Sequence, residues 1–394
     1  MKSALVVGAG IAGIATALRL RRSGWQVTIV ERAGGLRGGA YMIGFSGIGY
    51  DAARDWGLIP ALRAMQPTPV DLVYVDEAGE VRARMPVAAQ QAMLGNEQLA
   101  LLRGDLEAVL FNALDDQVDV RFGTSVTHIV DDGEVVTARL TDQTELTVDL
   151  LVGADGLHSA VRELVFGPEQ LHRRDLGYMV ATFLLDHAGA GLDLDSTVSM
   201  GLVGRALGVY KTRSEHGAAF FTFASDDLDV DMAAGPKTTL RRRFGDLGWV
   251  VPELLVQADA CDSIYFDRIS QIVMNRWSAG RVVLVGDAAW CVTLFGGYGS
   301  SLAVGGAELL GRMLDEQDDV LTALQSWERQ LRPLAEKKQR LGRRSRHLFV
   351  APNELVRSAQ LTTYRLAGSK LVLALVRRFV GIETVAKGAS NDKP

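Results

Sequence analysis

The chain has 394 residues, of which 48% are hydrophobic and 23% charged, and its formal net charge is −5. This length suits about two or three domain-sized units, and the composition is that of a globular protein rather than a disordered one. The acidic balance does not attract nucleic acid, and no segment approaches the roughly 18 continuous apolar residues of a membrane span. We therefore expect an enzyme that acts on a small molecule.

The two cysteines indicate neither a disulfide nor a metal site. Cys261 and Cys291 are far apart in the sequence and belong to no metal-ligand pattern. We expect no bound metal and two reduced thiols in a cytoplasmic protein. Lys2 and the apolar run after it resemble the start of a signal peptide, but the glycines within that run favour a strand and a turn.

The N-terminal segment predicts a βαβ unit. Residues 4–7 form an apolar strand, the glycine-rich residues 8–13 open a helix of small residues that ends near Ser23, and residues 26–30 form a second strand that ends in Glu31. Glycines let backbone N–H groups approach a pyrophosphate at a helix N-terminus, where the helix dipole favours anions. The residues expected to contact a nucleotide there are Gly8, Gly10, Ile11, Ala12 and Gly13.

Glu31 indicates which nucleotide fits this unit. An acid at this place can bind the adenosine ribose hydroxyls of FAD or NAD, and it would repel the 2′-phosphate of NADPH. Arg32 and Arg37 follow it, and each either touches the adenosine phosphates or lies on the surface. The sequence has no second GxGxxG segment, so a nicotinamide cofactor would have no dedicated domain.

Glycine placement and alternation predict the elements that follow. Residues 34–49 are glycine-rich and irregular, residues 50–65 predict a helix, and residues 71–75 and 80–85 predict a hairpin. Another helix begins at Arg103. Further strands are expected at residues 118–122, 125–131, 135–140 and 149–153, and the last of these runs into Asp155 and Gly156.

The second half of the chain predicts a different sheet. Strands from Val180 through Phe223 alternate apolar and polar residues, which is typical of an antiparallel sheet. The apolar residues 281–285 predict a buried parallel strand, so the chain re-enters the first domain there. From about Val320 onward the pattern is helical.

Two segments near the C-terminus have more than one interpretation. The charged residues 329–346 form a solvated helix face or attract an acidic partner. Residues 371–380 are amphipathic and could serve a membrane surface or a dimer, although packing across the two domains is our expectation.

Three motifs in this order resemble those of the flavoprotein monooxygenases typified by para-hydroxybenzoate hydroxylase. In length the chain is nearer to the tetracycline-inactivating flavin hydroxylases of that family. The motifs are residues 8–13 with Glu31, residues 155–162, and residues 286–289 followed by 296–299. With the domain order, the resemblance covers about residues 1–330. It implies that the chain binds FAD.

The resemblance implies further contacts with the cofactor. Asp155 and Gly156 match a motif that serves both FAD and NAD(P)H, and Arg103 matches an arginine that reaches the flavin cofactor. Asp287 lies just beyond a strand, where its carboxylate can accept bonds from ribityl hydroxyls, although it could instead merely cap a helix. A helix that begins near Ser300 would direct its N–H groups at the flavin pyrimidine edge. The other residues expected there are Gly297, Gly299 and Ser301.

The implied fold is α/β (α+β), with a Rossmann-like FAD-binding domain, an inserted antiparallel-sheet substrate domain and C-terminal helices. The domain boundaries that follow are residues 1–70, 98–165 and 280–330 for the FAD-binding domain, residues 71–97 and 166–279 for the substrate domain, and residues 331–394 for a helical segment across both.

The implied activity is that of an NAD(P)H-dependent monooxygenase. NADPH or NADH would reduce the bound FAD, O₂ would add at C4a, and the resulting hydroperoxide would hydroxylate an aromatic or polyketide-like molecule. The protein would be a monomer or a homodimer. Two other functions stay open, namely an FAD enzyme that does not oxygenate, such as a dehydrogenase or a cyclase with a structural FAD, and a non-catalytic flavin-binding protein.

The chain departs from the family pattern near Asp287. The family usually has His, Pro, Gln and Asn at four places where this chain has Trp290, Leu294, Tyr298 and Ser301. Backbone contacts to the flavin survive these changes, but side-chain control of oxygen chemistry is affected, and this favours the non-oxygenating alternative.

Substrate contacts are expected between the second sheet and the flavin. The candidate catalytic residues are Arg205 and Tyr210. Candidate lining residues are Phe45, Phe221, Phe223, Leu294 and Phe295. His158 and Arg162 are interpreted as structural, because no carboxylate partner occurs at a recognisable spacing.

Overall fold

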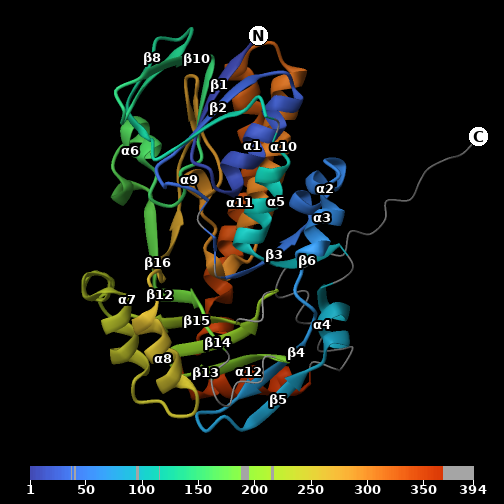
Figure 1. Cartoon of the computed structure of the whole chain (residues 1–394), viewed down its shortest axis with the longest axis vertical. Coiled ribbons are helices and arrows are strands. Elements are labelled where there is room, and N and C mark those ends of the chain that lie inside the picture. Colours follow the sequence, from blue (N-terminus) through green and yellow to red (C-terminus); the bar gives the residue numbers. More distant parts are fainter. Residues whose placement is uncertain are drawn as a thin grey trace, which may run out of the picture.

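Two sheets organise the protein, and helices connect and cover them (Figure 1). This computed structural model describes residues 1–36, 38–39, 41–94, 97–114, 116–187, 195–213 and 217–366. The predictions for Arg37 and for residues 371–380 lie outside these residues.

The first sheet has six strands and is largely parallel. In order across the sheet they are β17 (Ser278–Ala279), β18 (Val282–Leu284), β11 (Leu150–Gly153), β1 (Ser3–Val7), β2 (Gln26–Glu31) and β7 (Asp119–Phe122). The central strands are almost wholly buried, which is why they are continuous apolar runs in the sequence. The predicted βαβ unit is confirmed, since α1 (Ile11–Arg22) links the parallel strands β1 and β2.

Further elements complete the upper half of the molecule in Figure 1. α1 packs against α5 (Arg103–Asn112) and α10 (Gly299–Glu316). A three-stranded sheet contains β10 (Glu145–Val148), β9 (Val136–Leu140) and β8 (Val126–Asp131). α6 (Ala160–Phe166) packs against β8 of this sheet. The other short helices are η1 (Glu169–Leu171), α9 (Asp287–Trp290) and η2 (Leu294–Gly296).

The second sheet has seven strands and fills the lower half of Figure 1. Their order is β16 (Tyr265–Ile272), β12 (Arg173–Leu184), β15 (Gly217–Ala224), β14 (Arg205–Lys211), β13 (Ser196–Leu202), β4 (Asp71–Val75) and β5 (Val81–Met85). All neighbours are antiparallel except β13 and β4. α7 (Leu228–Phe244) and α8 (Val251–Ala260) pack on one face of this sheet, and the fold class is as expected.

Three predictions about elements need correction. Residues 50–65 form two helices, α2 (Ile48–Asp55) and α3 (Ile59–Ala64), because Gly57 between them adopts a left-handed φ of 77°. The glycine-rich residues 34–49 contain a strand, β3 (Met42–Ser46), which pairs with β6 (Gln98–Leu102). The helical region after Val320 is broken between α11 (Val320–Phe349) and α12 (Glu354–Arg365). The remaining helix is α4 (Val87–Leu94).

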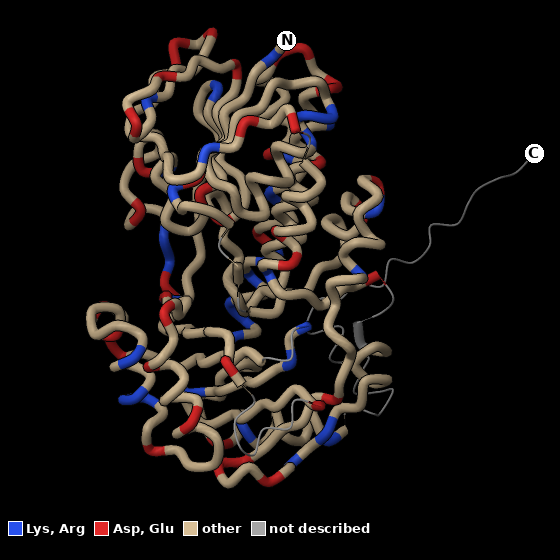
Figure 2. Tube along the Cα trace, viewed as in Figure 1, with Lys and Arg blue, Asp and Glu red and all other residues tan. Residues whose placement is uncertain are grey.

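α11 connects the two halves of the molecule. It packs against α10 and η2, and just beyond its end Ala351 forms a parallel bridge with Val203 after β13. Charges of both signs are interspersed along the Cα trace of both halves (Figure 2). No helix in the described part of the chain is long and apolar enough to cross a bilayer.

Candidate functional site

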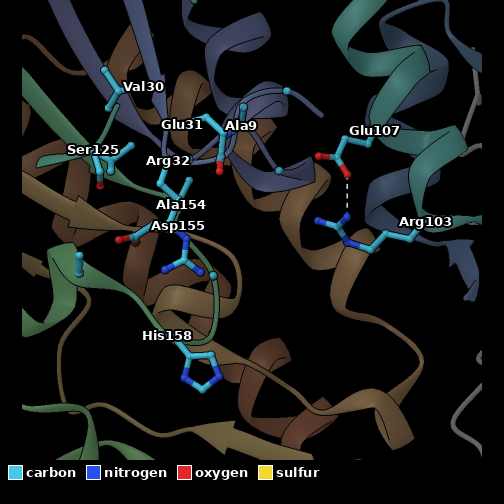
Figure 3. A pocket seen from close by; sticks show the side chains of 16 residues that line it. Ala9, Val30, Glu31, Arg32, Arg103, Glu107, Ser125, Ala154, Asp155 and His158 are labelled. Carbon is cyan, nitrogen blue, oxygen red and sulfur yellow. Dashed lines mark hydrogen bonds and ion pairs between the residues drawn. The ribbon is translucent and has the colours of Figure 1, made fainter. Parts of the chain in front are cut away.

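A pocket opens where β1 turns into α1 (Figure 3). It contains about 710 Å³ of empty space, part of which is open to solvent. Its walls come from β1, β2, α5 and the segment around Asp155. The sequence motifs at residues 8–13, 31–32, 103 and 155–156 therefore meet at one place.

The glycines of the first turn are required by packing. Gly8 has a φ of 109°, and a Cβ there would lie 2.6 Å from the Ala154 carbonyl oxygen. A Cβ on Gly13 would lie 1.8 Å from the carbonyl oxygen of Gly8, so α1 approaches β1 as closely as glycine allows. This close approach leaves the N-terminus of α1 facing the pocket, as a pyrophosphate site requires.

Glu31 lies at the end of β2, where the motif predicts a ribose contact. Its carboxylate accepts hydrogen bonds from the backbone N–H groups of Ala9, at 2.9 Å, and Ala33, at 2.8 Å. These bonds hold the side chain against the first turn. Arg32, the neighbour of Glu31, also lines the pocket.

Arg103 brings a positive charge to the same turn. Its Nη1 donates to Glu107 Oε2 at 2.6 Å, the contact drawn as a dashed line in Figure 3. Its Nη2 lies 3.3 Å from the position that a Cβ on Gly10 would take. Burial opposes the charge of this guanidinium, but Tyr41, Glu107 and Asp287 outweigh it and raise its pKa. The guanidinium thus adds positive charge beside the N-terminus of α1.

Asp155 supports the loop on the other side of the pocket. Its carboxylate accepts hydrogen bonds from Ser159 Oγ at 2.5 Å and from the Val161 N–H at 3.0 Å, before and within the first turn of α6. Burial raises its pKa, although these bonds oppose the effect. Gly156 has a left-handed φ of 82° and lines the pocket beside it.

Asp287 lies where the C-terminal motif predicts a flavin contact. It is the first residue of α9, and its Oδ1 lies 3.8 Å from the position of a Cβ on Gly299, at the start of α10. The side chain of Asp287 is exposed to solvent, but protein atoms surround it closely. The desolvation that they cause raises its pKa, and the positive charge of Arg103 opposes this shift.

The residues after Asp287 join α10 to β3. Ser300 Oγ donates to the Gly44 carbonyl at 3.3 Å, and the Ser46 N–H donates to Ser301 Oγ at 3.0 Å. Gly297, just before α10, is left-handed with a φ of 55°. The N-terminus of α10 is therefore fixed next to Asp287.

The four departures from the family pattern have structural roles. Trp290 is buried in an aromatic cluster with Trp277 and Trp327, with ring centroids 4.6 and 5.7 Å away. The Lys338 ammonium lies over the Tyr298 ring, 3.8 Å from its centroid. Ser301 holds the backbone of β3 as described, and Leu294 packs beside Phe295 in a small core cluster.

Several candidate substrate residues do not line the pocket described above. Phe221 and Phe223 point into the core under α7 and α8, where both pack edge-on against Phe244. Arg205 lies on the same face and pairs with Asp246 through two bonds of 2.6 and 2.7 Å. Phe45 is fully buried in the core of the first domain. Side-chain alternation explains these positions, because residues on the other face of each strand point toward the flavin motifs.

Leu294 and Phe295 pack against the seven-stranded sheet, on the face opposite α7 and α8. Phe295 packs edge-on against Tyr178 of β12 at 5.4 Å and is 3% exposed. Both residues belong to a core cluster that also contains Val350, the residue after α11. Both side chains are therefore packed against this face of the sheet.

Tyr210 points toward the first domain and is joined by two tyrosines that sequence analysis missed. Its hydroxyl accepts a hydrogen bond from the Met42 N–H of β3 at 3.3 Å, and burial raises its pKa. The rings of Tyr41 and Tyr265 lie 5.8 Å apart. Burial raises the pKa of Tyr41 to about 12, and Asp287 contributes to that shift. Both tyrosines thus lie within electrostatic reach of Asp287.

His158 does have carboxylate partners, contrary to expectation. Its Nδ1 is 3.0 Å from Glu169 Oε2, and its Nε2 is 3.1 Å from Asp267 Oδ2 on β16. The hydrogen bond with Asp267 is the main reason its pKa is raised. The fully buried Arg162 also contacts Glu169, at 3.1 Å, and donates to the Ala288 carbonyl. No spacing in the sequence indicates the contact with Asp267, because Asp267 is remote from His158 in the chain.

Comparison with protein families identifies the first domain. A family model described as FAD binding domain matches residues 1–183 and 258–335. These two segments include β1, β2 and the Asp155 loop, which line the pocket, and they also include Asp287.

Individual proteins are similar over most of the chain. A flavin-dependent monooxygenase from an unknown prokaryotic organism is 30% identical over 383 residues, covering 96% of each protein. An uncharacterised protein of Mycobacterium tuberculosis (strain ATCC 25618 / H37Rv) is 36% identical over 323 residues, covering 81% of this chain and 86% of that protein. The crystal structure of the tetracycline destructase Tet(51) superposes with a TM-score of 0.79 at 27% identity, covering 94% of this chain and 98% of that chain.

Proposed function

The chain belongs to the FAD binding domain family and is an FAD-dependent monooxygenase; on this premise, we propose that NAD(P)H reduces its FAD and that O₂ supplies an oxygen atom to an aromatic or polyketide-like molecule. Bound FAD supplies the redox and oxygen chemistry. The protein binds and orients the reactants and excludes water.

The position of Arg103 carries this proposal. Its guanidinium lies beside Gly10 at the first turn, and its charge also acts on Asp287 at the far end of the site. A ligand that contacts both places should carry an anionic group near Arg103 and hydroxyl groups near Asp287, as FAD does. The pocket at the first turn and the exposed carboxylate of Asp287 fit that description.

We assign the contacts along FAD in order. Glu31 binds the adenosine ribose, the N-terminus of α1 binds the pyrophosphate with Arg103, and Asp287 accepts bonds from the ribityl hydroxyls. The N-terminus of α10 then faces the flavin pyrimidine edge, where it favours negative charge by up to about 2 kcal/mol. Arg32 and the Asp155–Gly156 loop line the adenosine side of the same pocket.

We place the substrate between the flavin and the inner face of the seven-stranded sheet, meaning the face opposite α7 and α8. Tyr210, Tyr41 and Tyr265 supply aromatic surface there. Burial raises the pKa of all three phenols, so they are protonated at neutral pH. A protonated phenol can donate one hydrogen bond, and Tyr41 and Tyr265 can therefore donate to a substrate oxygen. Aromatic walls with a few hydroxyl donors suit a flat molecule that bears phenol or ketone groups.

The test uses the purified protein with its native FAD. We expect a flavin visible spectrum that NADH or NADPH bleaches anaerobically, and faster bleaching when an aromatic substrate is present. Under labelled O₂, one labelled oxygen atom should enter the product. Steady release of H₂O₂ with every phenol and polyketide tried, and no labelled product, would contradict the proposed substrate class.

A further inference from the structure

A second pocket lies on the inner face of the seven-stranded sheet, under the end of α11 and under α12. It holds about 490 Å³ of empty space. Its lining includes Tyr74, Phe220, Phe349 and Tyr364, and no charged residue is among the described residues that line it. The chemistry of these walls favours a neutral and largely apolar ring.

The aromatic side chains give this pocket the shape of a slot. The Tyr74 and Tyr364 rings are stacked, with centroids 5.2 Å apart and planes at 29°. Tyr74 is 4% exposed, and its hydroxyl lies against the Gly201 backbone. The proton of this hydroxyl has no acceptor among the described residues. A buried hydroxyl without an acceptor destabilises a protein, so a ligand oxygen that accepts a hydrogen bond from Tyr74 would remove this cost.

A row of paired residues, one on each strand from β16 to β4, runs across the sheet from the end near the flavin motifs to this pocket. The row begins at Tyr265, which is paired with Thr182, and Thr182 is paired with Phe220. Phe220 is paired in turn with Gly208. The row ends with the pairs Gly208–Ser199 and Ser199–Tyr74.

All members of this row point to the inner face of the sheet. Their sequence neighbours on either side, such as Phe183, Leu207 and Met200, belong to the core under α7 and α8. Neighbouring strands are about 4.8 Å apart, so the row extends for about 24 Å from Tyr265 to Tyr74. Small residues in its centre, Gly208 and Ser199, leave room for a flat molecule above the sheet.

We infer that this second pocket is a specificity site for a neutral ring remote from the reacting ring of an elongated substrate, held by a hydrogen bond from the Tyr74 hydroxyl and by the stacked ring of Tyr364. The inference rests on the proposed function, which places the reacting ring beside Tyr265 and the flavin. A single ring covers about one strand spacing and cannot reach both ends of the row. The enzyme therefore selects linked or fused rings over single ones.

The test compares two probes, resorcinol as a single ring and dihydroxyanthraquinone as a neutral fused-ring molecule. Affinities are measured on the FAD-loaded protein from the change in flavin absorbance or fluorescence on titration. The first variant is Gly208→Leu, which fills the row; a Cβ there meets no atom nearer than the Val198 carbonyl oxygen at 3.9 Å. We expect the ratio of the two affinities to fall at least about tenfold, in favour of resorcinol.

A second variant isolates the hydrogen bond. Tyr74→Phe keeps the stacked ring and should weaken dihydroxyanthraquinone binding by about fivefold to tenfold. Tyr50→Phe is the matched control, because it removes another buried hydroxyl, one that Arg63 contacts outside the pocket. Its affinity for both probes should stay within about twofold of the parent protein.

The outcomes separate this inference from the proposed function. If the parent protein binds dihydroxyanthraquinone no better than resorcinol, or if neither Gly208→Leu nor Tyr74→Phe changes the affinity ratio, the specificity site is wrong. If the ratio changes as expected but no ring compound accelerates NAD(P)H consumption, the site stands as a binding site and the proposed reaction fails.

Discussion

The nucleotide pocket and the inner face of the seven-stranded sheet are built in opposite ways. The pocket depends on backbone geometry, because glycines at positions 8 and 13 allow contacts that no other residue permits. The sheet face depends on alternate side chains from strands that are distant in the sequence, as the row from Tyr265 to Tyr74 shows. A change in the pocket should therefore affect FAD retention, and a change on the sheet face should affect substrate selection.

The largest effect is expected at Gly13. In Gly13→Ala the new Cβ would lie 1.8 Å from the Gly8 carbonyl oxygen, so α1 must move away from β1. We expect destabilisation of about 1–3 kcal/mol and FAD affinity at least about 100-fold lower, measured by denaturant unfolding and by flavin content after gel filtration. Gly248→Ala is the control, since its Cβ meets nothing nearer than 4.0 Å. Full flavin retention in Gly13→Ala would show that close packing of α1 is unimportant.

Arg103 gives the next largest effect. Arg103→Met removes a cation from the pocket and with it the ion pair to Glu107, whose side chain is 4% exposed. We expect FAD affinity to fall about 10-fold to 100-fold and stability to fall by about 2 kcal/mol, less than for a wholly buried pair because Arg103 is partly exposed. Isothermal titration with FAD and urea unfolding measure the two changes.

The double variant Arg103→Met/Glu107→Leu separates these contributions. It also removes the buried carboxylate, so stability should recover while FAD affinity stays low. Recovery of both quantities would mean that Arg103 acts only on Glu107 and makes no contact with the cofactor.

Two residues on one strand test the inner and outer faces of the second sheet. Tyr210 of β14 points to β3, whereas Arg205 of the same strand pairs with Asp246 beside α7. Tyr210→Phe should change KM for the substrate about threefold to tenfold and lower stability by about 1 kcal/mol, because it removes a hydroxyl that also accepts a hydrogen bond from the Met42 N–H. Arg205→Met should lower stability by about 1 kcal/mol or less and leave KM unchanged. Steady-state kinetics and thermal unfolding of both variants show which face of the sheet contacts the substrate.

This contrast explains which parts of the molecule the sequence predicts. The βαβ unit was predictable because its glycines and Glu31 are close in sequence and each is required locally. The break between α2 and α3 also had a local signal, a glycine at position 57 that ends a helix. Such features depend on a few consecutive residues.

The substrate face had no local signal of this kind. Alternation correctly places Phe221 and Phe223 on one face of β15, but both faces of that strand are buried, so hydrophobicity cannot tell which face meets the flavin. Tyr41 and Tyr265 are brought together by tertiary structure from opposite parts of the chain. The same is true of His158 and Asp267. Their positions require the register of strands that only the folded structure defines.

The smallest expected effect concerns His158, which joins the two regions. It links the loop after Asp155 to Asp267 of the seven-stranded sheet, and hydrogen bonds with Asp267 and Glu169 raise its pKa above the ordinary value near 6.5. A group whose pKa is raised by folding contributes its full stability below the unfolded value and loses it as the pH rises through the folded value. The parent protein should therefore become less stable from about pH 6.5 upward, by less than about 1 kcal/mol because the side chain is 45% exposed. His158→Gln should remove this part of the pH dependence, which thermal unfolding of both proteins across that range measures. If the two stability curves stay parallel from pH 6 to about pH 9, the imidazolium does not hold the two regions together.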